Sequence, residues 1–253
     1  MNDEQQLTAP ARSIVAAQTP WGPWSGLLGS VAITAGAFTA TVLYVTILQQ
    51  TGLQQTGRST PAAAQGWVTM AAFQVAMTAG AWWLAGWFGG KRTRVLSLSG
   101  TVPTLRDMAL ILGIFVLFTI PYTWAVYLYR PDVLIADNAP FASLMRSPDW
   151  PIYAIIIAIG APVSEELLFR GFLLPSLAKS RIGFAGAAIV TTVLWMALHF
   201  TYSIYGLIEI FMIGLLLSWA LRKTGSLWAP LAIHAINNGA LALAMKFQLL
   251  PWT

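Results

Sequence analysis

Long runs of hydrophobic residues, separated by short polar segments, dominate this chain. Each run has about the 20 residues that an α-helix needs to cross a bilayer. Seven runs can be distinguished, at residues 24–48, 67–88, 108–129, 151–177, 183–202, 203–221 and 226–247. A count of six or eight is also compatible, because the fifth and sixth runs are almost continuous at residues 201–206. The pattern predicts an all-α, polytopic transmembrane helical bundle.

Composition supports this assignment. Hydrophobic residues make up 57% of the 253 residues and charged residues only 9%, whereas soluble domains carry about 25% charged residues. The net charge of +5 does not indicate nucleic-acid binding, because the basic residues are scattered between the hydrophobic runs. The chain has no cysteine, which excludes disulfides and thiolate nucleophiles or metal ligands.

The basic residues are divided unequally between the two ends of the predicted bundle. One end carries Arg12, Lys91, Arg92, Arg94, Arg106, Lys179, Arg181, Arg222 and Lys223, and the other carries Arg58, Arg130, Arg146 and Lys246. By the positive-inside rule, we expect an integral protein of a bacterial plasma membrane with a cytoplasmic N-terminus.

We expect one integral membrane domain with three parts. Residues 1–22 form a polar cytoplasmic tail, residues 23–150 form the first three spans and a loop, and residues 151–253 form the last four spans. The loop at 130–150 contains a weakly hydrophobic piece, 139–145, which we expect to lie along the membrane interface.

Ionisable residues inside the hydrophobic runs are few and lie in the second half of the chain. A charged side chain at mid-membrane costs about 2.5–3.5 kcal/mol on insertion scales, so such residues usually face a protein interior and mark a functional site. Apart from Lys246 near the end of the last run, the charged residues and histidines of the runs are Glu165, Glu166, Arg170, His199, Glu209 and His234. We therefore predict a buried reaction centre built from the later helices.

Helical spacing sorts these side chains. Glu166 and Arg170 are i,i+4 neighbours with the acid first, which is the favourable order for an ion pair. Glu165 projects separately and is the freer carboxylate. His234 and Asn238 are also i,i+4 neighbours, as are Trp195 and His199.

Proline and glycine flank the acidic pair. Pro162 is expected to kink the fourth helix just before the acids, and Gly171 and Pro175 to weaken it just after. A helix broken in this way could open a water-filled pocket beside the carboxylates.

The second half of the chain contains three short motifs, which include both of its histidines. They are E-E-x-x-x-R from Glu165, an aromatic-x-x-x-H ending at His199, and H-x-x-x-N from His234. In this order they resemble the CAAX protease and bacteriocin-processing (CPBP or Abi) family of intramembrane glutamic endopeptidases, related to type II CAAX prenyl endopeptidase. The resemblance covers about residues 151–244. The family usually has Phe where this chain has Trp195, a residue that we expect to shape the pocket rather than react.

The resemblance implies hydrolysis of a peptide bond near the membrane, in a peptide or a membrane-anchored protein tail. Glu165 would act as the general base that activates water, with His199 orienting that water and moving its proton. Glu166, held by Arg170, would support the site. No cofactor is implied, and the expected partners are the substrate and the lipid bilayer, not nucleic acid.

The oxyanion of the tetrahedral intermediate would be bound by His234 and Asn238, at about 2.7–4 kcal/mol per donor in well-studied enzymes. The same chemistry permits a metal. Glu165, His199 and His234 would form a His₂Glu zinc site with an open position for water. The resemblance favours the metal-free version.

Structural interpretations compete with these roles. Glu166 and Arg170 could be a buried pair that only stabilises the helix, and Asn238 could join two helices, with neighbouring Asn237 as a control. Glu209, outside the motifs, could line the site or pair helices. The whole protein could be a non-catalytic bacteriocin-immunity or scaffolding protein of the same fold, or a proton-coupled transporter. A transporter should show repeat symmetry.

Overall fold

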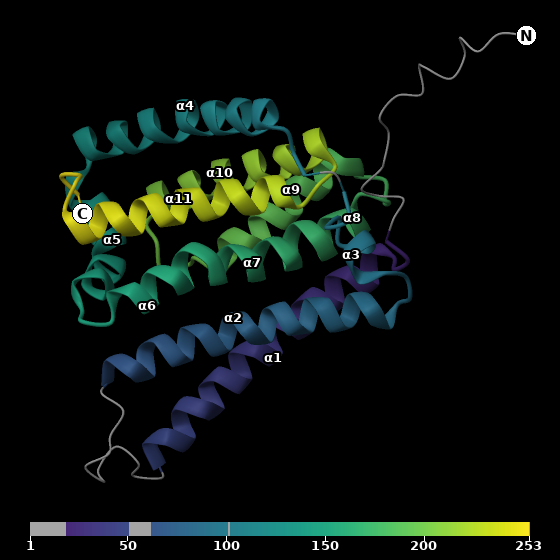
Figure 1. Ribbon diagram of the computed structural model, residues 1–253, viewed down its shortest axis with the longest axis horizontal. Coiled ribbons are helices and arrows are strands. Elements are labelled where there is room, and N and C mark those ends of the chain that lie inside the picture. Colours follow the sequence, from purple (N-terminus) through teal and green to yellow (C-terminus); the bar gives the residue numbers. More distant parts are fainter. Residues whose placement is uncertain (1–18, 51–61, 101, 253) are drawn as a thin grey trace, which may run out of the picture.

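The computed structural model describes residues 19–50, 62–100 and 102–252 (Figure 1). Within these ranges every regular element is a helix, which confirms the predicted all-α bundle. Most of the predicted tail at 1–22, with Arg12, lies outside the described residues, as does Arg58.

The helices follow the hydrophobic runs closely. The bounds are α1 Pro23–Gln50, α2 Ala62–Trp87, α3 Arg92–Val95, α4 Leu105–Tyr129, α5 Pro131–Arg146, α6 Trp150–Ile155, η2 Ile156–Gly160, α7 Ala161–Glu165, η3 Glu166–Leu173, α8 Leu174–Leu177, α9 Gly183–Ala197, α10 Ile204–Thr224 and α11 Trp228–Phe247. Five stretches of helix are long and hydrophobic enough to cross a membrane, and α9 is hydrophobic but shorter. The chain is an integral membrane protein.

The fourth run forms one continuous helical rod from Trp150 to Leu177, so the helix does not end beside the acids. Instead the backbone widens into two π-helical stretches, η2 before Pro162 and η3 before Pro175. A proline has no N–H to donate, and its ring clashes with a carbonyl one turn earlier. The wider π-turn accommodates both constraints without ending the helix.

Two boundaries differ from the prediction. Helix α9 ends at Ala197, so His199 lies in the turn that follows it and not on the helix itself. The segment predicted as a loop at 130–150 is mostly helix α5, which begins with Pro131 at its first position, where proline is favoured. Helix α5 buries one side of its surface through Leu134, Asn138, Ala142 and Met145.

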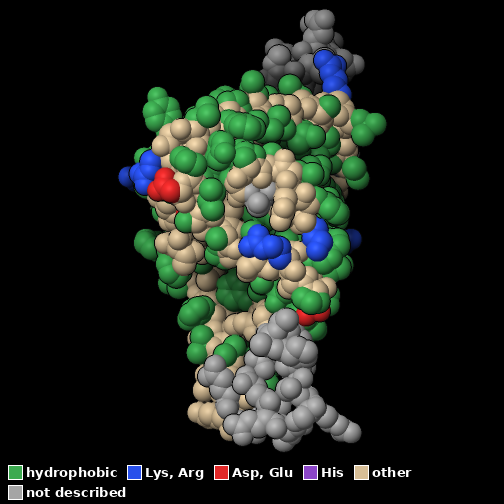
Figure 2. Space-filling model, turned by 90° about the vertical axis from the view of Figure 1, so that its left-hand side faces the viewer, with side chains coloured by type: hydrophobic (Ala, Val, Ile, Leu, Met, Phe, Trp, Pro, Cys, Tyr) green, Lys and Arg blue, Asp and Glu red, His purple; other side chains and the backbone are tan. Residues whose placement is uncertain are grey.

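The helix ends gather at two opposite ends of the bundle (Figure 1). At one end Lys223 lies 3.5 Å from Asp107, and the indole of Trp228 donates to the carbonyl of Leu98 at 3.0 Å. At the opposite end, α5 packs beside the C-terminal residues, and hydrophobic side chains dominate a surface with few charges (Figure 2). The cytoplasmic location of the N-terminus stays a prediction.

Helix α1 packs against the rod that carries the acids. Trp21, just before α1, stacks on Phe172 at 4.5 Å between ring centroids and donates its indole N–H to the Phe172 carbonyl at 3.1 Å. On α1 itself, a Cβ at Gly26 would overlap the hydroxyl of buried Ser176 in α8. Gly36 of the same helix has nothing within 4 Å of its Cβ position.

We predict that Gly26→Leu lowers the free energy of unfolding by about 1–3 kcal/mol, because overpacking forces helices apart. Gly36→Leu is the matched control and should leave stability close to wild type, since its side chain would point into open space. Thermal unfolding of the purified protein in detergent measures both. Equal melting temperatures for the two variants would contradict the α1–α8 packing.

Candidate active site

The structure brings together most of the predicted site residues, from separate helices. Glu165 ends α7 and Glu166 begins η3, so the two acids occupy the junction between an α-helical and a π-helical stretch. Arg170 follows in η3, and His234 and Asn238 come from α11. His199 approaches from the turn after α9.

Glu166 and Arg170 form the predicted ion pair. The distance between Arg170 Nη1 and Glu166 Oε1 is 3.0 Å, and both side chains are 0% exposed. Arg170 Nη2 also donates to the backbone carbonyl of Gly214 in α10 at 3.2 Å. The guanidinium lies over the indole of Trp195, 4.6 Å from the ring centroid. The arginine therefore joins η3 to both α9 and α10.

His234 connects the two acids. Its Nδ1 lies 2.9 Å from Glu166 Oε1, and since an ionised carboxylate only accepts, Nδ1 carries a proton there. Its Nε2 lies 3.9 Å from Glu165 Oε2. This gap exceeds hydrogen-bond length, and one water molecule can bridge the two atoms across it.

Glu165 is the more accessible carboxylate, as the spacing predicted. Its side chain is 16% exposed. Its Oε2 accepts a hydrogen bond of 2.6 Å from Trp195 Nε1. Trp195 was expected only to shape the pocket, so this contact is new. The signal was present in the sequence, because a buried indole N–H needs an acceptor.

His199 is held by the backbone of α9. Its Nδ1 lies 3.1 Å from the Trp195 carbonyl. Because a carbonyl can only accept, Nδ1 is the protonated nitrogen and Nε2 is the one available to a reacting molecule. The ring stands edge-on to Trp195 at 5.2 Å and to Tyr202 at 5.9 Å between centroids. The ring of His234 also meets Trp195 edge-on, at 5.5 Å.

Asn238 has a structural partner. Its Nδ2 donates to the carbonyl of Ile157 in η2 at 3.1 Å. In this π-turn the N–H of Ala161 bonds the carbonyl of Ile156, and Pro162 has no N–H to offer, so the Ile157 carbonyl needs a side-chain donor. The side chain of Asn237 donates to Asn238 Oδ1 at 3.3 Å. Asn237 therefore contacts Asn238 and is not the independent control that the sequence suggested.

Glu209 lies apart from this network. Its Oε1 accepts a hydrogen bond of 2.5 Å from the hydroxyl of Thr123 in α4. Among the described residues it forms no hydrogen bond with the predicted site residues. The contact between α4 and α10 supports the helix-pairing interpretation.

The arrangement is a poor match for tetrahedral zinc. Over the described ranges, no three side chains of His, Asp or Glu form a group that could hold a metal ion. Two ligands of one tetrahedral zinc lie about 3.3 Å apart, whereas Glu165 Oε2 and His234 Nε2 are 3.9 Å apart. A zinc ion bound to both atoms would require them to move closer.

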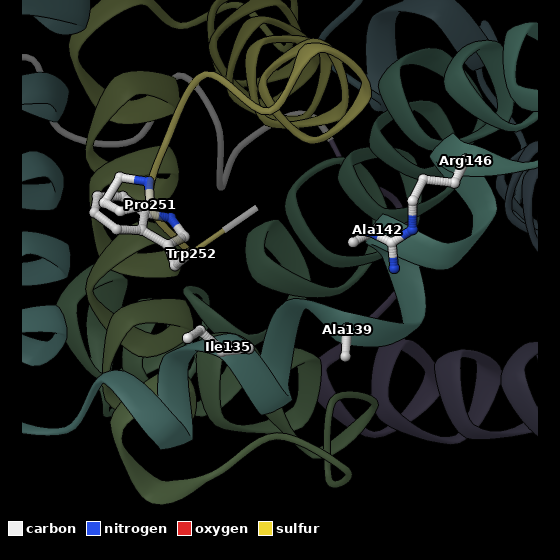
Figure 3. Close-up of a pocket in the computed structure, with 6 residues that line it drawn as sticks. All are labelled: Ile135, Ala139, Ala142, Arg146, Pro251 and Trp252. Carbon is white, nitrogen blue, oxygen red and sulfur yellow. The ribbon is translucent and has the colours of Figure 1, made fainter.

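Two cavities lie outside the predicted site. One, of about 150 Å³, is lined by Ile135, Ala139, Ala142, Arg146, Pro251 and Trp252, and Figure 3 shows it between α5 and the C-terminal residues. The other is a hydrophobic groove of about 540 Å³ between α2 and the rod from α6 to α7. It is lined by Gly160 and Val163 among others, but by neither of the paired acids.

Residues 147–240 match the family model of the type II CAAX prenyl endopeptidase Rce1-like proteins. This segment is an Rce1-like domain. All of the predicted site residues lie within it, and no solved structure matches the chain significantly.

Bacterial proteins resemble parts of this chain. An uncharacterized 24.3 kDa protein of Escherichia coli is 36% identical over 34% of this chain and 41% of its own length. The UPF0177 protein YxdF of Lactococcus lactis is 28% identical over 38% of this chain and 55% of its own. The uncharacterized protein YpbD of Bacillus subtilis is 28% identical over 57% of this chain and 73% of its own. The chain thus spans about half the length of the first two relatives.

We predict that Arg170→Leu lowers the free energy of unfolding by about 3–5 kcal/mol, because it leaves the charge of Glu166 buried without its cation. The matched control is Arg130→Leu. Arg130 pairs with Asp132 at the same 3.0 Å, but the two side chains are 48% and 67% exposed, so water replaces the lost contact. Thermal unfolding of both variants in detergent tests this, and equal losses of stability would contradict it.

Proposed function

We propose that the Rce1-like domain is a glutamic-type intramembrane endopeptidase, which hydrolyses a peptide bond near the membrane in a peptide or a membrane-anchored protein tail. One observation carries the proposal. A partly accessible carboxylate, Glu165, faces an imidazole across a gap of water size, while the adjacent acid, Glu166, is bound to a buried arginine. Family membership supports a CAAX-protease-like fold for the domain.

The proposed reaction begins with a water hydrogen-bonded to Glu165. The carboxylate takes one proton from the water as general base, and the resulting hydroxide adds to the carbonyl carbon of the substrate. The proton then passes from Glu165 to the leaving nitrogen as the C–N bond breaks. His199, with Nδ1 bound to a carbonyl, can accept a hydrogen bond from the water at Nε2 and orient it.

His234 is the proposed donor to the oxyanion. Its Nδ1 donates to Glu166, and its Nε2, which faces Glu165, would donate to the oxyanion when both ring nitrogens carry a proton. Asn238 would contribute its second amide hydrogen, because one is bound to the Ile157 carbonyl. An oxyanion donor typically contributes about 2.7–4 kcal/mol to the transition state.

A non-catalytic role, such as bacteriocin immunity or scaffolding, is the competing function. It is favoured by the structural partners of Asn238, Glu166 and Arg170, which account for these residues without any reaction. Glu165 separates the two functions, because a scaffold needs this side chain only as the acceptor for Trp195, a role that glutamine can also fill.

Glu165→Gln should lower kcat at least about a hundredfold, the contribution of a general base, and peptides normally cut by the protein should accumulate. The measurement compares the membrane and secreted peptides of cells that express wild type or variant, followed by cleavage of the accumulating peptides with purified protein. Glu209→Gln is the matched control and should cleave at the wild-type rate. Equal processing by wild type and Glu165→Gln would contradict the peptidase and favour the scaffold.

We also propose that the reaction needs no metal. Exhaustive treatment with a chelator should leave the cleavage rate within about twofold of the untreated enzyme, because the donor separation suits water better than tetrahedral zinc. Metal analysis of the purified protein accompanies the assay. Loss of activity that added zinc restores would instead identify Glu165, His199 and His234 as ligands.

A further inference from the structure

Trp195 was expected only to shape the pocket, but it contacts four residues of the candidate site. Its Nε1 donates to Glu165 Oε2 at 2.6 Å, its ring lies under the guanidinium of Arg170, and both histidine rings meet it edge-on. The side chain itself is 2% exposed. One indole therefore touches the proposed base, the buried cation and both imidazoles.

The hydrogen bond holds the oxygen of Glu165 that faces His234, since Oε2 is also the atom 3.9 Å from His234 Nε2. Within the described ranges, every hydrogen bond of this side chain uses Oε2. A donor bound to Oε2 restricts the position of this oxygen and of the water proposed to bind it. Such orientation matters for reaction, since misplacement of a catalytic group by about 1 Å can cost a hundredfold in rate.

The indole is itself held in place from its other side. Arg170 lies 4.6 Å from its centroid and is fixed by Glu166 and by the carbonyl of Gly214. A cation over an indole face is attracted by the ring, more so where water is excluded. The buried ion pair is thereby connected to Glu165 through Trp195, although it has no hydrogen bond with Glu165 itself.

We infer that Trp195 is a positioning residue. Its ring is held by Arg170 of the Glu166–Arg170 pair, and its indole N–H in turn holds the Glu165 carboxylate in place. The inference rests on the proposed function of Glu165 as general base. The contact is more than packing, because the indole donates a directed hydrogen bond to Glu165. A phenylalanine has a smaller ring and no N–H, so it cannot make this bond.

The first test is spectroscopic and needs no substrate. The full-length protein carries 12 tryptophans, and ¹⁵N-labelling of their indoles followed by NMR in detergent gives one signal for each. Trp195→Phe removes and so assigns one signal. We expect its proton to resonate downfield of the others, as for a short bond to a carboxylate, and to move upfield in Glu165→Gln. A signal that Glu165→Gln leaves unmoved would overturn the inference.

The second test is kinetic and uses a peptide that accumulates in Glu165→Gln cells as the probe. Trp195→Phe should lower kcat about tenfold or more with little change in KM, because the hydrogen bond that orients the base is lost while an aromatic side chain stays in its place. The control is Trp87→Phe, which alters an exposed indole of α2 and should match wild type. A kcat for Trp195→Phe equal to wild type, with Glu165→Gln inactive, would overturn the positioning role and leave the peptidase intact. A wild type no faster than Glu165→Gln would instead overturn the proposed function, and the positioning role with it.

Discussion

The ion pair between Glu166 and Arg170 is the interaction on which the rest of the candidate site depends. Two charges with no exposed surface carry a desolvation cost of several kcal/mol each, which is offset only if further hydrogen bonds satisfy their remaining atoms. Here His234 supplies one bond to Glu166, and a backbone carbonyl supplies one to Arg170. Glu166 Oε2 and Arg170 Nε have no hydrogen-bond partner among the described residues, so the pair is satisfied only in part. The need to satisfy one pair therefore fixes η3, α10 and α11 relative to one another.

The backbone of α10 can reach the arginine because residue 214 has no side chain. A Cβ at Gly214 would lie 2.5 Å from Thr192 Cγ2 in α9 and 3.1 Å from Arg170 Nη2. The glycine thus allows α9 and α10 to approach closely while exposing a carbonyl to the guanidinium. Small residues serve helix contacts in membranes in this way, because packing and hydrogen bonds replace the hydrophobic driving force.

Much of the bundle and part of the site could be predicted from the sequence. The hydrophobic runs predicted the helices, because a segment that crosses a membrane needs about 20 residues whose backbone groups bond one another. The i,i+4 spacing predicted the Glu166–Arg170 pair. The bond from Asn238 to Ile157 could not be predicted. It depends on the carbonyl of Ile157, which has no backbone donor because the helix forms a π-turn here and Pro162 has no N–H. The bond from Trp195 to Glu165 depends on the relative rotation of α9 and α7, which the spacing within one helix does not determine.

The two adjacent acids are suited to different tasks because their surroundings differ. Glu166 is bound by a cation and an imidazole and has no exposed surface, so its role is to hold the helices together. Glu165 is one residue away on the same rod and shares neither the cation nor the full burial. Its only side-chain hydrogen bond within the described ranges comes from a neutral donor, the indole of Trp195, at one oxygen. A carboxylate that is oriented but not neutralised keeps its capacity to accept a proton, which is the property that hydrolysis by activated water requires.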